Sequence, residues 1–368
     1  MARIALEARS LSTLGGGVRT YTLEVIRRLP RVGAAHDYHV FYDASKYRGI
    51  FGGVTEHVVP VGHPLLRLAW DFFLLPPALK AARVDLVHYF KSAVSPWGRQ
   101  PSVATVHDII PLLFPQTQMR VQRWYWEIQL PLVARTCTHL ITTSENSKRD
   151  IVERLQVPPE RITVTLPGVD ERFHPATVEA SATVRRAYAL PEQFVLVLGT
   201  IEPRKNIARL LRAFARVSVH VPHHLVLAGK WGWKYEDVQA ALKDPRLRGR
   251  VHVLSYVPSE HLPALMSSAD AFVFPSLYEG FGLPPLEAMA CGTPVVTSSV
   301  SSVPEAVGPH ALTVHPEDED ALAGAVERLV TDRVLHDRLA RDGIAWARQF
   351  TWDRTAAQTL TVYEQLLH

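Results

Sequence analysis

The sequence has few of the features that mark several specialised protein classes. It contains only two cysteines, Cys137 and Cys291, which are far apart and lack the short spacing of a metal site, so we expect neither a disulfide framework nor a zinc centre. Its longest apolar runs, such as 72–77 and 194–198, are much shorter than the ~18 residues that a membrane-spanning helix needs. The beginning does not resemble a signal peptide, so we expect a cytoplasmic protein.

The sequence also lacks low-complexity tracts and repeats of short period. No basic run contains interleaved aromatic residues, so we do not expect nucleic acid as a partner. The glycines at 15–17 have neither the Gly-x-Gly-x-x-Gly spacing nor a following Gly-Lys-Ser/Thr. They are therefore a weak signal, which fits a strand-to-helix turn about as well as a loop that reaches a ligand.

What is present indicates a globular protein of two domains. The chain has 368 residues, of which 47% are apolar and 21% charged, and this length exceeds the usual size of one domain. Its charge is uneven, because residues 1–175 carry 21 Lys and Arg against 15 Asp and Glu, a net +6, whereas residues 176–368 carry 19 against 21, a net −2. The basic half is compatible with an anionic substrate, an anionic membrane surface or merely a solvated surface.

Short apolar runs alternate with helical patterns along the first half of the chain. Alternation of helices with continuously apolar strands predicts a parallel sheet that is covered on both faces. The strands expected there are 2–8, 38–42, 85–89, 102–107, 139–143 and 162–165.

The same alternation begins again after a polar stretch at 172–192. We therefore predict an α/β protein with two Rossmann-like, doubly wound domains in tandem, 1–175 and 176–350. A break at 350–352 precedes a last helix, in the segment 351–368, which we expect to pack back on the first domain. The second set of strands is 194–199, 224–228, 251–254, 271–274, 294–297 and 311–314, with helices over 206–218 and within 318–350.

Several polar or glycine-rich segments follow directly after predicted strands. Ligands of open parallel sheets bind beyond the carboxyl ends of the strands. We therefore expect a ligand site in a cleft between the two sheets. The segments are Gly15 to Gly17, His107-Asp108, Arg204-Lys205 and the EGFG sequence at 279–282.

The stretch EGFGLPPLE places two carboxylates, Glu279 and Glu287, on either side of a glycine-rich turn. The glycines allow consecutive N–H groups to point into one concavity, and the prolines suit the first turn of a helix. This arrangement predicts an anion pocket with two strong hydrogen-bond acceptors, which suits a ligand with phosphates and hydroxyls. The alternative is an ordinary loop in which Glu287 merely stabilises the start of a helix.

Arg204 and Lys205 lie in GTIEPRKN, between a strand and a helix. Two fixed cations at this point suit a diphosphate, because Arg binds phosphate bidentately and Lys adds a point charge. The alternative is a pair of solvated loop cations. Their position at a strand end favours phosphate binding.

One histidine at a strand end is followed by an acidic residue and a turn. His107 and Asp108 end the strand SVATV, and Pro111 closes the turn, so we place this imidazole at the mouth of the expected cleft. The alternative is a histidine with an ordinary structural role. His88, inside DLVHYF, lacks such a position, and we interpret it as structural.

Three other patterns predict local structure. Ser302 and Glu305 fit a capping box, and Ser144 fits a helix N-cap. The aromatic run at 124–126 cannot all face one core, so some of these rings are candidates to border an acceptor site or a membrane surface.

Together, these segments resemble those of the retaining GT-B glycosyltransferases of family four, over essentially the whole chain. The interdomain turn reads Leu-Pro-Gly-Val-Asp at 166–170, where the family commonly has Pro-Asn-Gly-Val-Asp, a departure that concerns the hinge. The matching segments are GGGVRTYT, TVHDIIPLLFP, GTIEPRKN, EGFGLPPLEAMACGTPVVTS and SSVPE.

The resemblance implies a nucleotide-diphosphate sugar bound chiefly by the second domain and an acceptor bound chiefly by the first. It implies catalytic roles for His107 beside the donor sugar, Glu279 on the sugar hydroxyls, and Arg204 with Lys205 on the diphosphate. No metal or further cofactor is implied, because the cations offset the leaving charge and the leaving phosphate acts as base. The implied donor-binding residues are Gly16 and Gly17 near the diphosphate, the amides of Gly280, Phe281, Gly282 and Leu283, and Glu287 on the ribose.

The resemblance is strongest to members that use GDP-mannose, on the segments HDIIPLLFP and SSVPE. It implies transfer of a sugar, mannose in the first instance, to a saccharide or lipid-linked saccharide in cell-surface glycan or polysaccharide synthesis. Peripheral contact with the anionic inner face of the membrane is compatible with the basic first half. The alternatives are a UDP- or dTDP-sugar donor, a nucleotide-sugar epimerase of the same fold, and a noncatalytic nucleotide-sugar-binding subunit.

Overall fold

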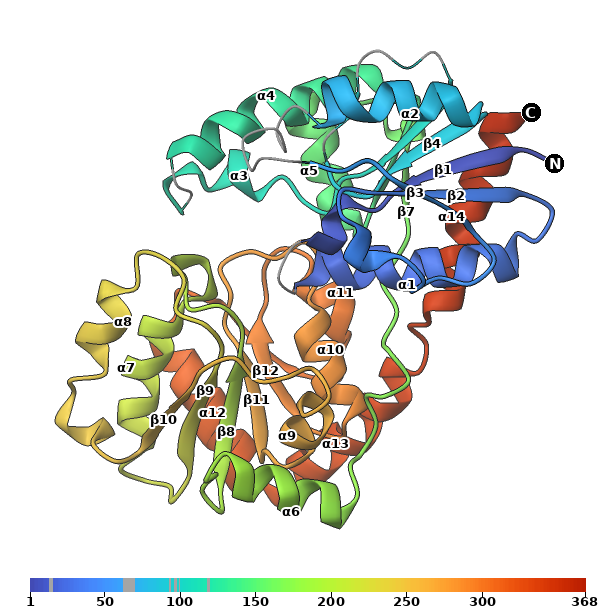
Figure 1. Cartoon of the computed structure of the whole chain (residues 1–368). Helices are drawn as coiled ribbons and strands as arrows, with labels where there is room; N and C mark the ends of the chain where they lie inside the picture. Colours follow the sequence, from blue (N-terminus) through green and yellow to red (C-terminus); the bar gives the residue numbers. More distant parts are fainter. Residues whose placement is uncertain (13–15, 62–69, 93, 96–97, 99, 118–119) are drawn as a thin grey trace. The chain divides into compact units, whose positions relative to one another are not determined.

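The structure is a computed structural model that describes residues 1–12, 16–61, 70–92, 94–95, 98, 100–117 and 120–368. Gly15 of the predicted glycine turn lies outside the described residues. The chain forms two compact units. Unit 1 is Met1–Gly168 together with Thr351–His368, and unit 2 is Val169–Phe350. Each unit is a parallel sheet between layers of helices (Figure 1).

The described residues of unit 1 form a seven-stranded sheet in the order β3-β2-β1-β4-β5-β6-β7. Every ladder is parallel, and the strand order reverses direction between β1 and β4, as in other doubly wound sheets. The strands are β1 Arg3–Glu7, β2 Asp37–Tyr42, β3 Thr55–Val58, β4 Leu86–Tyr89, β5 Ser102–Thr105, β6 His139–Thr142 and β7 Ile162–Val164.

Helices cover both faces of this sheet (Figure 1). Apolar residues of α2, α4 and α5 pack on one face in a continuous core that includes Leu79, Leu130 and Ile151. On the other face, α1 packs against α14. The helices are α1 Gly17–Val32, α2 Leu75–Ala82, α3 Ile110–Leu113, α4 Arg120–Thr136, α5 Glu145–Leu155 and α14 Trp352–Leu367.

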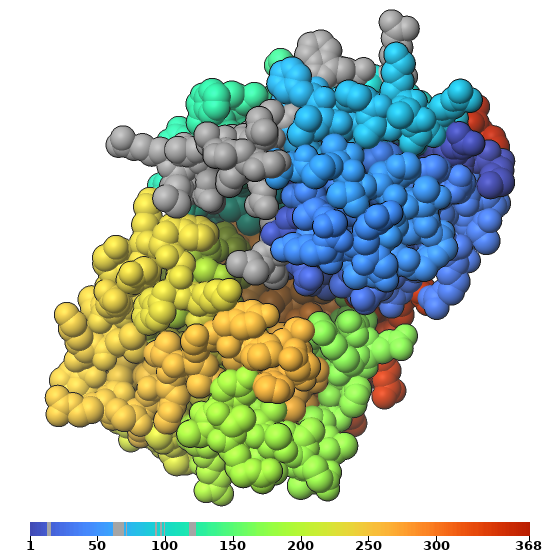
Figure 2. Space-filling view, viewed as in Figure 1, coloured from blue at the N-terminus to red at the C-terminus, as the bar shows by residue number. Residues whose placement is uncertain are grey.

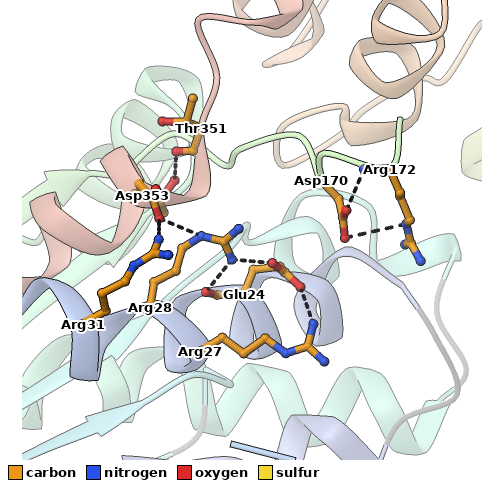
Figure 3. Close-up of polar contacts among 9 residues, drawn as sticks. Glu24, Arg27, Arg28, Arg31, Asp170, Arg172, Thr351 and Asp353 are labelled. Atoms are coloured by element: carbon orange, nitrogen blue, oxygen red, sulfur yellow. Dashed lines mark hydrogen bonds and ion pairs between the residues drawn. The ribbon is translucent and has the colours of Figure 1, made fainter. Parts of the chain in front are cut away.

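Ion pairs fasten the first turn of α14 to α1 (Figure 3). The Asp353 carboxylate lies 2.9 Å from Arg28 Nε and 2.5 Å from Arg31 Nη2. Arg28 also pairs with the buried Glu24 on its own helix. The Thr351 hydroxyl oxygen accepts a hydrogen bond from the backbone N–H of residue 354 and so caps α14. The last helix of the chain is therefore an integral part of unit 1.

Unit 2 has a six-stranded parallel sheet in the order β10-β9-β8-β11-β12-β13. The strands are β8 Phe194–Leu198, β9 His224–Ala228, β10 Val251–Leu254, β11 Ala271–Phe274, β12 Val295–Ser298 and β13 Leu312–Val314. The helices are α6 Val178–Ala187, α7 Ile207–Val217, α8 Glu236–Ala241, α9 Leu262–Ser267, α10 Leu283–Ala290, α11 Val303–Val307, α12 Glu319–Thr331 and α13 Arg333–Ala347.

The core of unit 2 joins α7 and α12 to one face of the sheet, with residues such as Leu210, Phe214 and Val326. The sequence of α7 has a clear amphipathic pattern, and its apolar side is almost completely buried. The segments that carry α6 (green) and α8 (yellow) lie on the surface of unit 2 that Figure 2 shows.

The predicted pair of parallel α/β sheets is confirmed, and every predicted strand overlaps an observed one. The sequence missed β3, because this short edge strand, TEHV, is half-exposed and has no continuous apolar run. The units divide between Gly168 and Val169, a few residues before the predicted limit at 175. Among the described helices, none combines the length and the apolar character that a membrane crossing requires.

Candidate active site

The loop after β8 presents two cations on a rigid turn. Pro203–Lys205 form a single 3₁₀ turn, and Asn206 follows with φ 59°, in the left-handed region that Asn tolerates. The buried Asn206 amide donates hydrogen bonds to the carbonyls of Pro275, at 3.1 Å, and Pro316, at 2.7 Å. These bonds fix the turn against the loops after β11 and β13, so the positions of Arg204 and Lys205 are determined by the sheet.

Both cations converge on Glu279, which follows β11. Glu279 Oε1 lies 2.6 Å from Lys205 Nζ and 2.7 Å from Arg204 Nη1. Arg204 Nη2 also pairs with Glu202 Oε1 at 2.6 Å. All four side chains are largely buried. The structure therefore brings together the PRKN and EGFG loops, which the sequence could place only at two strand ends.

Burial and charge compete at this cluster. Burial alone would raise the pKa of Glu279, but the charges of Lys205 and Arg204 outweigh it and lower this pKa to about 2. Burial lowers the pKa of Lys205, although Glu279 opposes that shift. The Lys205 ammonium also lies 4.5 Å from the centre of the Phe274 ring. Glu279 is therefore a carboxylate throughout the physiological range.

The glycine turn leads directly into α10. Gly282 precedes this helix with φ 118°, a conformation that favours glycine. The Ser302 hydroxyl donates to the carbonyls of Glu279, at 2.7 Å, and Phe281, at 3.0 Å. The Ser301 hydroxyl oxygen accepts from the Glu279 N–H at 3.1 Å. The turn is thus held by two adjacent serines of a different loop.

These contacts correct one prediction. The Ser302 half of the predicted capping box is wrong, because Ser302 has helical backbone angles and its side chain makes no cap hydrogen bond to α11. The carbonyls of the EGFG turn compete for the same hydroxyl and bind it instead. The helix-capping role of Glu305 stays a prediction. The prediction for Ser144 is confirmed, since its hydroxyl oxygen accepts from the Ser147 N–H at 3.0 Å at the start of α5.

Glu287 lies on α10. Burial raises its pKa to about 7, the nearby charge of Arg172 opposes this shift, and Asp170 adds to it. Asp170 and Arg172 form an ion pair at 3.6 Å in the turn that begins unit 2 (Figure 3). Glu287 is therefore a carboxyl group that changes charge near neutral pH, unlike Glu279 in the loop that precedes α10.

In unit 1, His107 follows β5. Its Nε2 nitrogen lies 3.2 Å from the Phe90 carbonyl, so Nε2 carries the proton and donates. Burial lowers the pKa of His107 to about 4, against the opposing effect of this hydrogen bond. Its backbone carbonyl accepts from the hydroxyls of Thr143, at 3.0 Å, and Ser147, at 3.2 Å. At neutral pH the imidazole is uncharged and its backbone is fixed.

A cavity of about 290 Å³ opens beside His107 in unit 1. It brings His107 together with Gly16 and Gly17, and it also includes Trp126 of the aromatic run. Trp124 instead is 66% exposed. The lining residues are Gly16, Gly17, Val18, Lys91, Ser92, His107, Asp108, Pro111, Trp126 and Leu130.

His88 has the structural role that the sequence suggested. It is fully buried, and its two ring nitrogens contact the hydroxyls of Tyr363 and Thr105. Sequence reasoning missed the roles of Glu202, Asn206 and Ser301. All three residues lie in segments that the sequence analysis had already singled out. Glu202 and Asn206 belong to GTIEPRKN, and Ser301 is the first serine of SSVPE. In the part of the chain that is described, no group of three or more His, Cys, Asp and Glu side chains could hold a metal ion.

Comparison with known proteins adds the family. Residues 15–173 match Glycosyltransferase Family 4, and residues 183–346 match Glycosyl transferases group 1. The O-antigen chain mannosyltransferase B of Escherichia coli is 31% identical over 95% of this chain and 96% of its own length. The chain belongs to the family 4 glycosyltransferases.

A second sequence relative and a solved structure show how much of the chain is similar to known proteins. The serotype-specific mannosyltransferase WbdA of Escherichia coli is 28% identical over 74% of this chain, but this glycosyltransferase spans only 34% of WbdA. Anabaena Alr3699/HepE, solved in complex with UDP-glucose, is 20% identical with a TM-score of 0.79 and covers 99% of this chain and 100% of its own. The two-sheet architecture of this family 4 glycosyltransferase is the GT-B fold.

Proposed function

We propose that this glycosyltransferase moves mannose from GDP-mannose, with retained anomeric configuration, to a saccharide or lipid-linked saccharide acceptor in the synthesis of a cell-surface glycan. The observation that carries the proposal is the convergence of Arg204 and Lys205 on Glu279, beside a glycine turn that starts a helix. The relatives named as mannosyltransferases support the choice of sugar.

In this proposal, unit 2 binds the donor. Arg204 and Lys205 share their contacts between Glu279 and the diphosphate, while the amides of 280–283 contact the phosphate and the sugar. Glu279 accepts hydrogen bonds from sugar hydroxyls, and its low pKa keeps both oxygens available as acceptors. Glu287 binds the ribose hydroxyls. Cations fixed before the reaction begins stabilise the charge of the leaving diphosphate at little reorganisation cost, so the proposal requires no metal.

Unit 1 supplies the remaining groups. His107 lies beside the donor sugar as a neutral imidazole, and Gly16 and Gly17 lie near the diphosphate. In the transfer step, the bond between the anomeric carbon and the phosphate oxygen breaks, and the acceptor oxygen bonds to the same carbon on the same face. The acceptor proton passes to the leaving phosphate, so no side chain is needed as a base.

The acceptor is assigned to the first domain. The net charge of +6 over residues 1–175 supports an acceptor linked to an anionic lipid diphosphate. Such an acceptor would place the enzyme on the cytoplasmic side, in peripheral contact with an anionic membrane. Trp126, at the cavity beside His107, is a candidate to contact the acceptor.

The test of the donor is a thermal-shift panel of GDP, UDP, dTDP and ADP with their sugars. A ligand that binds the native state alone raises the midpoint of unfolding. We expect the largest shift with GDP and GDP-mannose, and a preference for UDP would overturn the choice of donor. Incubation with the donor alone separates transfer from epimerisation, because an epimerase would change the sugar without an acceptor. The anomeric configuration of an isolated product, read by NMR, tests retention.

A further inference from the structure

A group of buried aromatic rings lies behind His107 in unit 1. The Tyr21 ring of α1 meets the His107 imidazole edge to face, with ring centres 5.0 Å apart and planes at 85°. Trp352 of α14 meets Tyr21 in the same manner, at 5.8 Å and 77°. Both Tyr21 and Trp352 are almost completely buried. Rings at these distances and angles are in the edge-to-face arrangement that aromatic pairs prefer.

The hydroxyl end of Tyr21 is also fixed. Its oxygen lies 2.6 Å from the Thr165 hydroxyl oxygen at the end of β7. Burial raises the pKa of Tyr21 to about 12, partly offset by hydrogen bonds with Thr165, Thr359 and Thr105, so the phenol stays protonated. Tyr21 is therefore held at its hydroxyl by hydrogen bonds and at its ring by Trp352, and it cannot move away from His107 without losing both.

The His107 imidazole makes a hydrogen bond at one of its two ring nitrogens. The hydrogen bond from Nε2 to the Phe90 carbonyl, at 3.2 Å, restrains one nitrogen but still leaves the imidazole some rotation about the Cβ–Cγ bond. Among the described residues, none makes a hydrogen bond to His107 Nδ1. The Tyr21 ring, which meets the imidazole edge to face, is therefore placed to restrain the plane of the His107 ring.

The indole N–H of Trp352 indicates that this residue acts through its ring. Its indole N–H is buried and has no hydrogen-bond partner among the described residues. A buried donor without an acceptor destabilises the folded state, and phenylalanine at this position would avoid that cost. The indole therefore serves here through its ring, which fills the space behind Tyr21.

We propose that Tyr21 is a positioning residue that sets the plane of the His107 imidazole, and that Trp352 supports Tyr21 from behind. The last helix of the chain then helps to orient a side chain of the site, although it contributes no group to the cavity lining. This inference rests on the proposed place of His107 beside the donor sugar. It goes beyond that proposal by naming the groups that keep the imidazole in the productive orientation.

The test compares Tyr21→Leu, which removes the ring, with Tyr21→Phe, which keeps it. Tyr363→Leu is the matched control, because Tyr363 is a fully buried tyrosine of α14 whose hydroxyl contacts His88 rather than His107. The measurements on the full chain are kcat and the donor KM, the thermal midpoint, and the ¹⁵N NMR signals of the His107 ring over a pH titration.

In Tyr21→Leu we expect kcat to fall about tenfold or more, while the donor KM stays within about threefold of the wild-type value. Small displacements of groups at a reacting centre can lower the rate up to about a hundredfold. The ¹⁵N signals should show a mixture of tautomers and a His107 pKa that moves up toward its ordinary value. Tyr21→Phe should return kcat to within about threefold of wild type. Tyr363→Leu should lower the thermal midpoint but leave kcat and the His107 signals unchanged.

Wild-type kcat together with wild-type His107 signals in Tyr21→Leu would overturn the proposal, as would an equal loss of kcat in Tyr363→Leu. If Tyr21→Leu does not fold, Trp352→Leu removes only the supporting ring and is judged by the same signals. Full activity of His107→Ala would refute the proposed role of His107, whereas the NMR titration of Tyr21→Leu would still decide whether Tyr21 orients that ring.

Discussion

Lys205 is a buried cation whose position in the fold determines which charges it can contact. Its ammonium group is buried, binds Glu279 and lies over an aromatic ring. If it also binds the leaving diphosphate, its loss removes a donor that acts on developing charge. Such donors contribute about 2.7–4 kcal/mol in comparable sites.

We therefore predict that Lys205→Ala lowers kcat/KM by about a hundredfold to a thousandfold, which corresponds to that range of free energy. Lys243→Ala, at an exposed lysine of the same unit, is the matched control and should have wild-type activity. Steady-state kinetics with the confirmed donor measure both. Undiminished turnover of Lys205→Ala would remove Lys205 from the mechanism.

Glu287 gives a prediction about pH. Its pKa is raised from 4.5 to about 7 in the folded chain, so the stability that it contributes is complete below about 4.5 and is lost as the pH rises through about 7. Between pH 5 and pH 8, the wild-type free energy of unfolding should fall relative to that of Glu287→Gln by on the order of 2 kcal/mol. Urea unfolding of both proteins without nucleotide measures this difference, and parallel pH profiles would contradict the assignment.

At the scale of the element, the EGFG turn depends on a loop from another part of the chain. Ser302 donates to two carbonyls of this turn, so Ser302→Ala leaves both without this donor. We expect a loss of stability of about 1–3 kcal/mol and a higher donor KM, because the amides that follow these carbonyls lose their fixed direction.

The control for that variant is Ser299→Ala, since Ser299 is exposed and lies on the same loop. Thermal unfolding and donor titration of both variants separate a specific effect on the turn from a general effect on the loop. A normal donor KM in a destabilised Ser302→Ala would show that Ser302 stabilises the unit without shaping the donor site.

At the scale of the whole molecule, the two units differ in how the chain builds them. Unit 2 is a continuous segment, whereas unit 1 needs the last eighteen residues in addition to Met1–Gly168. Gly168 also packs against the backbone where α14 begins, and a Cβ there would lie only 2.1 Å from the Trp352 nitrogen. The end of the first segment of unit 1 and the start of its second segment thus lie directly against each other.

We predict that the fragment 169–350 folds alone and unfolds cooperatively, whereas 1–168 does not. Without α14, the shorter fragment exposes the buried faces that Trp352 and Tyr363 cover. Adding 351–368 as a separate peptide should restore a cooperative transition to 1–168. Circular dichroism during heating measures all three samples. A stable 1–168 fragment would show that α14 is dispensable for the fold of unit 1.

The sequence by itself determined the features that depend on neighbouring residues. Continuous apolar runs specified the parallel strands, and the Gly-Phe-Gly turn placed Gly282 where a positive φ is needed. The Ser144 cap was also readable, because its acceptor and its donor are only three residues apart. The motifs around Arg204 and Glu279 were sufficient to indicate the family.

Only the tertiary structure decided the contacts between distant segments. It paired Lys205 with Glu279, gave Ser302 to the EGFG turn instead of a helix cap, and placed Trp352 behind Tyr21. No local rule fixes such partners, because a hydroxyl or an ammonium group binds whichever acceptor the packed core brings within reach. The energy of burial selects that packing, and it is a property of the whole unit rather than of any segment.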